Sequence, residues 1–456
     1  MTRPKPRYRT LMIAMLLTAQ PLFSGFAAAE TVTVDRALLE QLQKVIQQQQ
    51  QQLSQQSQKL ESQAALLESL GKQVQSISSA TATAQNQASE ANAAAKQAVE
   101  TAGKAETLAK AAPAGNKLVR AGTKGARLTL SGQVNRALTQ ADDGHSSELY
   151  NVDNDASNTR IRLTGTAQAT NDLTIGTRWE YAVTSNESSE VSQDDESPGE
   201  FTDLRWAEVS LHSKTWGKLS LGKGDTASNN SAEVDLSQTD VIQYSNFASI
   251  MGGMKFRDKN DNLTSIRVSD AFDNLDGLSR KNRVRYDTPT YAGFGFSTSV
   301  IEDQRYDAAL TWGGKGYGLK AAGALAFADP NEDDAGNQYD SSFSLLHENS
   351  GLNFTLSAGV LELDNQGDQT SVWGKVGWIQ RFFPVGDTAF GVDYGRSTNF
   401  PSGSYDGYSA GAAVVQEFDD YGTELYAQIR KFSLSNSDTP KVQDITGATI
   451  GARVKF

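Results

Sequence analysis

Alternation of apolar and polar residues dominates the chain from residue 127 to its end. Counted back by twos from Phe456, the last segment places apolar or small residues on one face, while Lys455 and Arg453 lie between them. A period of two is typical of a β-strand with one apolar and one polar face. A strand at the end of a chain would leave an unpaired edge. We therefore expect it to pair with an earlier strand and close a barrel.

The same period recurs in sixteen segments, which are separated by breaks rich in Gly, Asn, Asp and Ser. Most segments have the length of tilted strands that cross an apolar band of about 25 Å. We predict strands over residues 127–139, 158–169, 173–184, 204–213, 217–223, 281–288, 292–301, 305–313, 317–328, 339–348, 352–363, 371–382, 388–396, 408–418, 422–433 and 443–456.

The breaks between these segments alternate in length. Tight turns such as 171–172 and 349–350 alternate with longer polar breaks such as 185–202 and 397–407. Short turns on one side and long loops on the other are typical of a bacterial outer-membrane barrel, with the long loops outside. A soluble sandwich or propeller is the alternative, and the aromatic terminus and the loop asymmetry both weigh against it. The pattern thus predicts an all-β transmembrane barrel of about sixteen antiparallel strands over residues 126–456.

A different period governs the chain before the barrel. From Leu39 to Ala105, Leu, Ile, Val, Gln and Ala recur at alternating spacings of three and four residues. This is the a/d register of a left-handed coiled coil, about 100 Å long if fully helical. A disordered spacer rich in Gln and Ala is the alternative. We assign an α-helical coiled coil to residues 30–111, and a linker that contains Pro113 and Gly115 to residues 112–125.

The first 29 residues have the features of a secretory signal peptide. Basic residues between Arg3 and Arg9 precede a short apolar run, and Ala27-Ala28-Ala29 fits a cleavage site. The run is shorter than the ~20 apolar residues that a transmembrane helix needs, although an uncleaved anchor is the alternative. The chain contains no Cys, which excludes a lipoprotein anchor and disulfides.

Composition excludes several classes of function. A net charge of −12 argues against nucleic-acid binding. The mean hydropathy of −0.47 is low for helical membrane spans but normal where only alternate residues meet lipid. The only histidines, His145, His212 and His347, show no metal-ligand spacing, and no hydrolase or phosphate-binding motif is present. We predict no enzyme activity, no cofactor and no metal, with a barrel hydrolase as the weaker alternative.

One break, residues 224–280, is far longer than ordinary connections. It is preceded by Gly217-Lys-Leu-Ser-Leu-Gly-Lys-Gly224 and followed by Lys281-Asn-Arg-Val-Arg-Tyr-Asp-Thr-Pro-Thr-Tyr-Ala-Gly-Phe294. With the terminal Phe456, these segments resemble the general trimeric porin superfamily of Gram-negative bacteria, over residues 127–456. The resemblance implies a water-filled outer-membrane channel for passive diffusion of small hydrophilic solutes and ions. It also implies a homotrimer and a third loop that folds into the lumen.

Two alternatives stay open at this point. The long break could be a disordered external insertion. The chain could be a barrel-anchored adhesin of the trimeric-autotransporter kind, which also joins a coiled coil to a barrel, although each chain there supplies only a few strands. Because even-stranded barrels begin and end on the periplasmic side, we expect the N-terminal segment in the periplasm. The expected partners are outer-membrane lipid, lipopolysaccharide and, through the coiled coil, peptidoglycan.

Alternation also assigns charged residues to the lumen, since Lys or Arg facing lipid at mid-depth costs about 2–4 kcal/mol. The candidate pore-lining basic residues are Arg160, Arg162, Arg178, Arg283 and Arg285. The candidate acidic residues of the constriction loop are Asp225, Glu233, Asp235, Asp240, Asp270 and Asp273. A basic wall opposite an acidic loop would create a transverse field at the narrowest point. The alternative for each residue is an ordinary solvated charge in the lumen.

Overall fold

A computed structural model describes residue 44 and residues 125–332, 335–364, 367–400, 405–435 and 441–456. The predicted signal peptide, the predicted coiled coil and the linker up to residue 124 lie outside the described residues, apart from the single position Lys44. Among the described residues, no helix is both long and apolar enough to cross a membrane.

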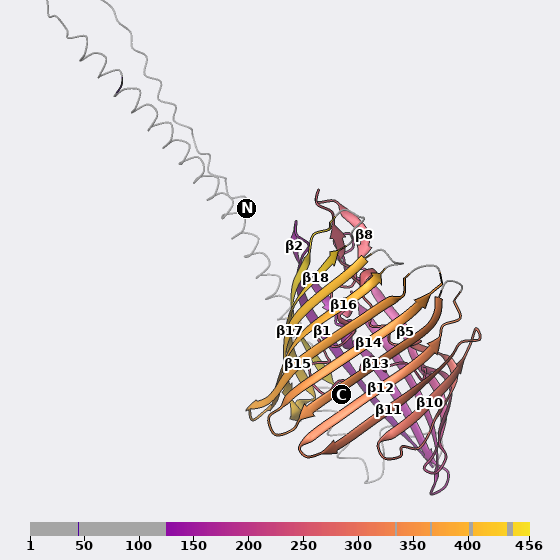
Figure 1. Cartoon of the computed structure of the whole chain (residues 1–456). Helices are drawn as coiled ribbons and strands as arrows, with labels where there is room; N and C mark the ends of the chain where they lie inside the picture. Colours follow the sequence, from indigo (N-terminus) through magenta and orange to yellow (C-terminus); the bar gives the residue numbers. More distant parts are fainter. Residues whose placement is uncertain (1–43, 45–124, 333–334, 365–366, 401–404, 436–440) are drawn as a thin grey trace, which may run out of the picture. The chain divides into compact units, whose positions relative to one another are not determined.

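Seventeen strands between residues 126 and 455 form one antiparallel sheet that closes into a barrel of tilted strands (Figure 1). Both β2 and β3 pair with β1, so these two short strands share one of the sixteen positions around the barrel. The barrel strands are β1 (Ala126–Asp142), β2 (Ser147–Asp153), β3 (Arg160–Gln168), β4 (Leu173–Ser185), β5 (Glu200–Ser213), β6 (Gly217–Asp225), β9 (Arg280–Asp287), β10 (Phe294–Ile301), β11 (Tyr306–Gly316), β12 (Leu319–Asp329), β13 (Ala335–His347), β14 (Leu352–Leu363), β15 (Gln369–Phe383), β16 (Gly386–Phe400), β17 (Tyr405–Phe418), β18 (Thr423–Ser435) and β19 (Ile445–Lys455).

The C-terminal strand closes the barrel, as the alternation predicted. β19 pairs with β1 from Gln133↔Lys455 to Asp142↔Thr446. The backbones of Gly132 and Phe456 exchange two further hydrogen bonds, of 2.9 and 3.0 Å. All sixteen predicted segments coincide with barrel strands. The strands that alternation missed are β2 and the two short strands inside the long loop.

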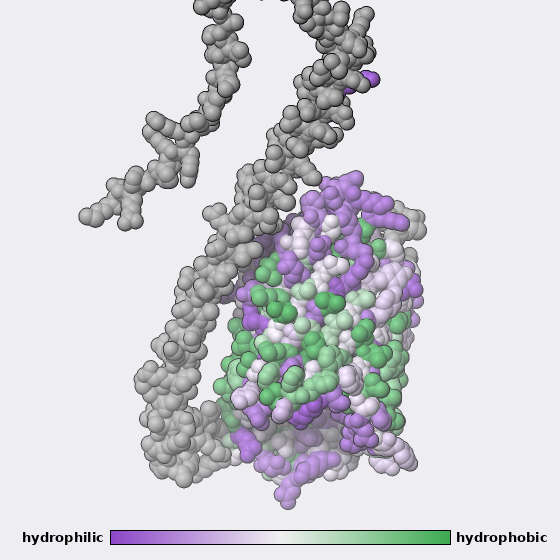
Figure 2. Space-filling model, turned by 90° about the vertical axis from the view of Figure 1, so that its left-hand side faces the viewer, coloured by the Kyte–Doolittle hydropathy of each residue, from purple (hydrophilic) through white to green (hydrophobic). Residues whose placement is uncertain are grey.

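The outer face of the barrel is apolar between two polar ends. Figure 2 shows a hydrophobic band across the middle of the barrel face in view, with hydrophilic residues above and below it. Exposed aliphatic side chains such as Val183, Leu221 and Val392 contribute to this face. Aromatic side chains gather in groups near its edges, including Trp378, Phe382 and Phe390 beside a short turn and Tyr306, Phe327 and Tyr339 beside the longer loops. This distribution is that of a membrane-spanning barrel.

The long loop, residues 226–279, folds into the barrel interior. It contains η2 (Phe247–Ser249), the hairpin of β7 (Lys255–Arg257) and β8 (Leu263–Arg267), and α2 (Val268–Ala271). Its buried Phe247 and Phe272 pack against each other and against Phe432 on β18, with ring centroids 5.3–6.4 Å apart. Burial of these rings against the inner wall supplies apolar stabilisation that a loop in water would lack. The prediction of an inward-folded third loop is therefore confirmed.

Glycines on the inner wall make room for this loop. A Cβ atom added to Gly395 would lie 2.4 Å from the ring of Phe247, and one added to Gly407 would lie 2.4 Å from the ring of Phe272. A Cβ atom added to Gly391 would lie 2.0 Å from Gln243 Oε1, and one added to Gly447 would lie 2.2 Å from Met251 Sδ, in two other side chains of the loop. The inner faces of β16, β17 and β19 are thus shaped to receive the loop.

Buried polar contacts fix the loop at a second place on the wall. Lys375 of β15 forms an ion pair with Asp235, and both side chains are almost fully buried. The same Nζ donates to Thr239 Oγ1 at 2.8 Å and to the carbonyl of Gln243 at 2.9 Å. A buried ammonium group is tolerated only when its donors are satisfied, so these contacts tie the loop to one position.

The tip of the long loop rises to the end of the barrel that carries the long connections. In the β7–β8 hairpin, Arg257 Nε lies 2.6 Å from Asp143 Oδ2 in the loop after β1. The backbone N–H of Gln443, before β19, donates to the carbonyl of Arg257 at 2.8 Å. Figure 1 places β8 at the same end of the barrel as β2. Not all of the loop therefore narrows the lumen.

Replacing Gly395 with Leu should displace the loop from its place on β16. Overpacking of this kind costs about 1–3 kcal/mol, because the new side chain occupies the position of the Phe247 ring. We expect a lower thermal unfolding midpoint and faster proteolytic cleavage within the long loop. Gly313→Leu is the matched control, since nothing lies within 4 Å of a Cβ added there. Equal behaviour of the two variants would contradict the proposed fit.

Candidate functional site: an arginine cluster in the barrel wall

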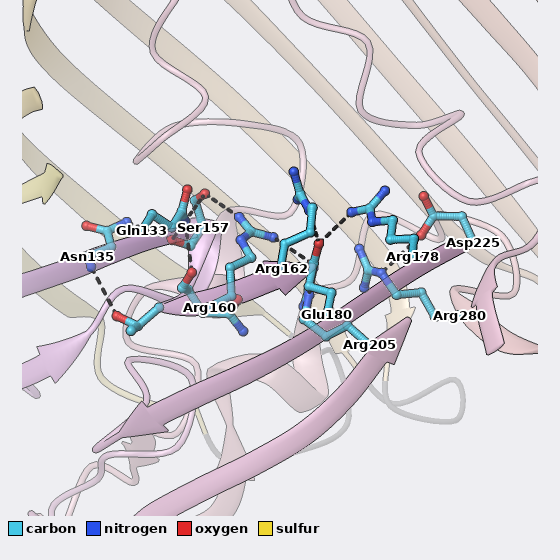
Figure 3. A network of polar contacts seen from close by, with 12 residues as sticks. Gln133, Asn135, Ser157, Arg160, Arg162, Arg178, Glu180, Arg205, Asp225 and Arg280 are labelled. Atoms are coloured by element: carbon cyan, nitrogen blue, oxygen red, sulfur yellow. Dashed lines mark hydrogen bonds and ion pairs between the residues drawn. The ribbon is translucent and has the colours of Figure 1, made fainter. Parts of the chain in front are cut away.

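Four arginines surround one carboxylate on the inner face of β3, β4 and β5 (Figure 3). Arg162 Nε and Arg178 Nη2 each lie 2.5 Å from Glu180 Oε2. Arg205 Nε lies 2.9 Å from Glu180 Oε1, and Arg160 Nη1 lies 3.8 Å from the same oxygen. Alternation along β3 and β4, together with the pairing of Arg162 with Glu180, directs these side chains inward.

Positive charge dominates the surface of this cluster. The Glu180 side chain is only 1% exposed, whereas Arg162 is 37% and Arg178 27% exposed. Glu180, even together with Asp155, whose carboxylate lies near Arg160 and Arg205, cannot neutralise four guanidinium groups, which stay charged at any pH that the protein meets. The exposed guanidinium groups therefore present an excess of positive charge to the lumen.

A break between β2 and β3 extends the cluster on one side. There the short helix η1 (Asp155–Ser157) is capped by Asn154, whose side chain accepts from the Ala156 N–H. The η1 residue Ser157 has an Oγ that accepts from Arg160 Nη2 and from Arg453 Nη1, each at 2.7 Å. This hydroxyl links the cluster to Arg453 on β19, which pairs with Glu424.

On the other side, the arginines support the origin of the long loop. The guanidinium carbon of Arg178 lies 3.6 Å from the ring centroid of Trp206, within cation–π range. Arg283 is 4% exposed, lies 2.6 Å from Glu208 Oε2 and donates to the carbonyls of Gly222 and Asp225. Arg285 contacts Asp287 and the carbonyl of Thr226. Arg283 is thus buried in the wall, where it fixes the loop's first residues.

The six candidate acidic residues do not gather on one face. Asp225 is the last residue of β6 and lies 3.0 Å from Arg280, so it belongs to the basic side of the pore. Asp235 is buried against Lys375. Glu233 is half-buried and accepts from Asn274 Nδ2. The remaining three, Asp240, Asp270 and Asp273, are exposed, and Asp270 accepts from the Arg267 N–H before α2.

Sequence reasoning missed three members of the cluster. Glu180 lies two residues after Arg178 and so on the same face of its strand, but nothing in the sequence marked it as the shared partner of four arginines. Arg205 stands at a β-bulge, where Glu180 pairs with Trp206 and the next residue pairs with Leu204. A bulge changes the phase of alternation, so the face of Arg205 was not predictable. Ser157 lies in a break that only the structure shows to turn inward.

The described part of the chain holds no group of three or more His, Cys, Asp or Glu side chains placed to bind a metal ion. A family model described as Gram-negative porin matches residues 76–438. This chain belongs to the Gram-negative porin family. The family and the fold are those of outer-membrane channels, which are typically not enzymes.

Solved structures share the fold of this porin at low sequence identity. The anion-selective porin from Comamonas acidovorans is 16% identical, with a TM-score of 0.51, and the match covers 73% of this chain and 100% of that one. The outer membrane channel DcaP of Acinetobacter baumannii is 13% identical, with a TM-score of 0.49, covering 74% and 100%. The trimer form of OmpT from Vibrio cholerae is 14% identical, with a TM-score of 0.47, covering 73% and 100%. No curated protein matches the sequence.

Proposed function

We propose that this porin is a water-filled channel for passive diffusion of small hydrophilic solutes and ions, and that it prefers anions. The observation that carries the proposal is the excess of guanidinium groups around Glu180 on the inner face of β3–β5. Fixed positive charge in a narrow aqueous passage raises the local concentration of anions and repels cations.

The path for solutes runs beside the long loop. A barrel of this size encloses more space than its own side chains fill. The apolar part of the loop covers inner faces of β16–β19, whereas the arginine cluster lies on β3–β5. Several arginines of the cluster remain partly exposed with the loop in place, which supports an opening beside them.

The proposed assembly is a homotrimer in the outer membrane, in contact with lipid and lipopolysaccharide. Membership of the porin family supports this assembly, and OmpT of Vibrio cholerae, which shares the fold, has a structure described as a trimer form. Pairing of β1 with β19 within one chain is unlike a trimeric autotransporter, in which each chain supplies only a few strands of a shared barrel.

Planar-bilayer recording of the purified wild-type protein tests this function. We expect stepwise conductance without added ligand, with the steps grouped in threes. Under a KCl gradient, the sign of the reversal potential should indicate that Cl⁻ permeates more readily than K⁺. A protein that gives no conductance would overturn the channel proposal. A reversal potential near zero or of the opposite sign would leave the channel but overturn the anion preference.

We also propose that residues 39–105 form a parallel three-stranded coiled coil in the periplasm, within reach of peptidoglycan. Three copies held by a trimer have a high effective concentration, which would offset a seam weak in apolar residues. Single cysteines at Leu53 and at Ala91 should therefore yield trimeric adducts on crosslinking in cells. Loss of these adducts at both positions, with the barrel trimer intact, would rule out the coiled coil.

A further inference from the structure

Two arms of the long loop run together where it leaves and re-enters the barrel wall. We call residues 226–234 and 273–279 the neck. The carboxylate of Asp276 on the returning arm accepts from the backbone N–H groups of Asn230 and Ala232 on the outgoing arm, at 2.7 and 2.9 Å. Glu233 Oε1 accepts from Asn274 Nδ2 at 3.0 Å. Two carboxyl groups thus join the arms.

The neck packs against the wall through further carboxylates. Asp307 of β11 accepts from the backbone N–H and the hydroxyl of Ser228, at 2.8 and 2.6 Å. Gln338 of β13 donates to the carbonyl of Leu275 at 2.7 Å. Asp340, two residues further along β13, is 3% exposed, and neither of its carboxylate oxygens has a hydrogen-bond donor among the described residues.

Negative charge at the neck greatly exceeds positive charge. The carboxyl groups near Glu233 and Asp276 come from the loop, from the end of β6 and from the wall, and the nearby base is Arg280, which pairs with Asp225. The phenol of Tyr244 also lies near Glu233. The acidic members are Asp225, Glu233, Asp273, Asp276, Asp307 and Asp340. So many carboxylates cannot all ionise at close range without strong mutual repulsion.

Burial and neighbouring charges change the titration of the two loop carboxyl groups. Burial, with the charge of Asp276 added, raises the pKa of Glu233 to about 8. Burial raises the pKa of Asp276 to about 6, although the two backbone N–H groups that it accepts from oppose the shift. A carboxyl whose pKa is raised in the folded state keeps its proton at low pH. The stability of the folded neck therefore falls as the pH rises from the ordinary carboxyl range toward the raised pKa.

We propose that the neck is a pH-sensitive hinge, which holds the long loop against the wall while Glu233 is protonated and loosens when Glu233 ionises. Ionisation would place a new charge beside Asp276 and Asp340, with no base in contact to compensate it. The expected consequence is a second position of the loop, and so a second conductance level, at alkaline pH. This inference rests on the proposed channel function.

The test is single-channel recording of the wild-type porin between pH 6 and pH 10 in 1 M KCl. At that salt concentration the Debye length is about 3 Å, so a change of conductance reports movement more than the direct field of one charge. We expect the occupancy of the second level to rise as the pH approaches about 8, by at most about tenfold per pH unit, and to level off above that value, where Glu233 is ionised in both positions of the loop. A single level at every pH would overturn the hinge, whereas no conductance at any pH would overturn the channel instead.

Variants identify the group responsible. Glu233→Gln should keep a single level throughout the pH range, because the amide cannot ionise. Asp340→Asn should move the transition to lower pH, because the loss of a neighbouring carboxylate makes ionisation of Glu233 easier, and it keeps the proposal testable if Glu233→Gln fails to fold. Asp270→Asn, at an exposed loop carboxyl outside the neck, should behave as wild type. A transition that persists unchanged in Glu233→Gln, or that does not move in Asp340→Asn, would refute the assignment to the neck.

Discussion

Replacing Arg162 and Arg178 together with Gln should shift the reversal potential strongly toward cations. These two guanidinium groups are the most exposed of the four around Glu180, and their removal leaves that carboxylate with fewer compensating charges. The interaction energy of two unit charges 4 Å apart in water is about 1 kcal/mol, which corresponds to roughly a fivefold change in local ion concentration. The measurement is the reversal potential of the double variant under a KCl gradient.

Salt dependence and a matched arginine separate this effect from a general change of charge. The shift should be largest near 0.1 M salt, where the Debye length is about 10 Å, and small at 1 M. Arg396→Gln removes an arginine that pairs with Asp406 and lies over the ring of Tyr408, away from the cluster, and should leave the reversal potential unchanged. An unchanged potential in the double variant would mean that the two arginines do not line the ion path.

Deleting residues 230–270 should produce the largest increase in conductance. The deletion removes the part of the loop that lies on β15–β19 and leaves the wall intact, so the lumen widens; we expect the conductance to rise roughly twofold or more. It also removes Asp235, the partner of the buried Lys375, and so adds a free positive charge to the inner wall. The measurements are single-channel conductance and reversal potential.

A smaller deletion serves as the control. Residues 258–262 form the tip of the β7–β8 hairpin, which reaches the loop end of the barrel near Gln443. Their removal should change conductance far less than removal of 230–270. If the larger deletion leaves conductance at the wild-type value, the long loop does not narrow the conducting path.

The strands of this porin were predictable because each side chain along a strand can point in only two directions, toward lipid or toward the barrel interior. A residue of β19 faces either lipid or the interior, and a charged side chain such as Arg453 is costly on the lipid side. Two-fold alternation therefore gave both the strand positions and their phase. The closing partner of β19 followed from the cost of an unpaired edge in a membrane.

The same reasoning could not give the contacts inside the barrel. Alternation shows that Arg162 and Glu180 point inward, but their meeting depends on register between neighbouring strands and, for Arg205, on a bulge. The acidic residues of the long loop share no such period. Asp235 pairs with Lys375 and Asp225 pairs with Arg280, on different parts of the barrel wall, although both aspartates were expected on one acidic face.

Sequence alone determined the barrel, its closure and the inward direction of its basic residues, because local alternation and the exclusion of charge from lipid act on each strand separately. Only the tertiary structure decided where the long loop lies and which charges stay uncompensated. Those outcomes depend on fits between distant segments, such as Phe247 against Gly395 and Lys375 against Asp235, and no single strand carries that information. The positive surface left around Glu180 results from these pairings.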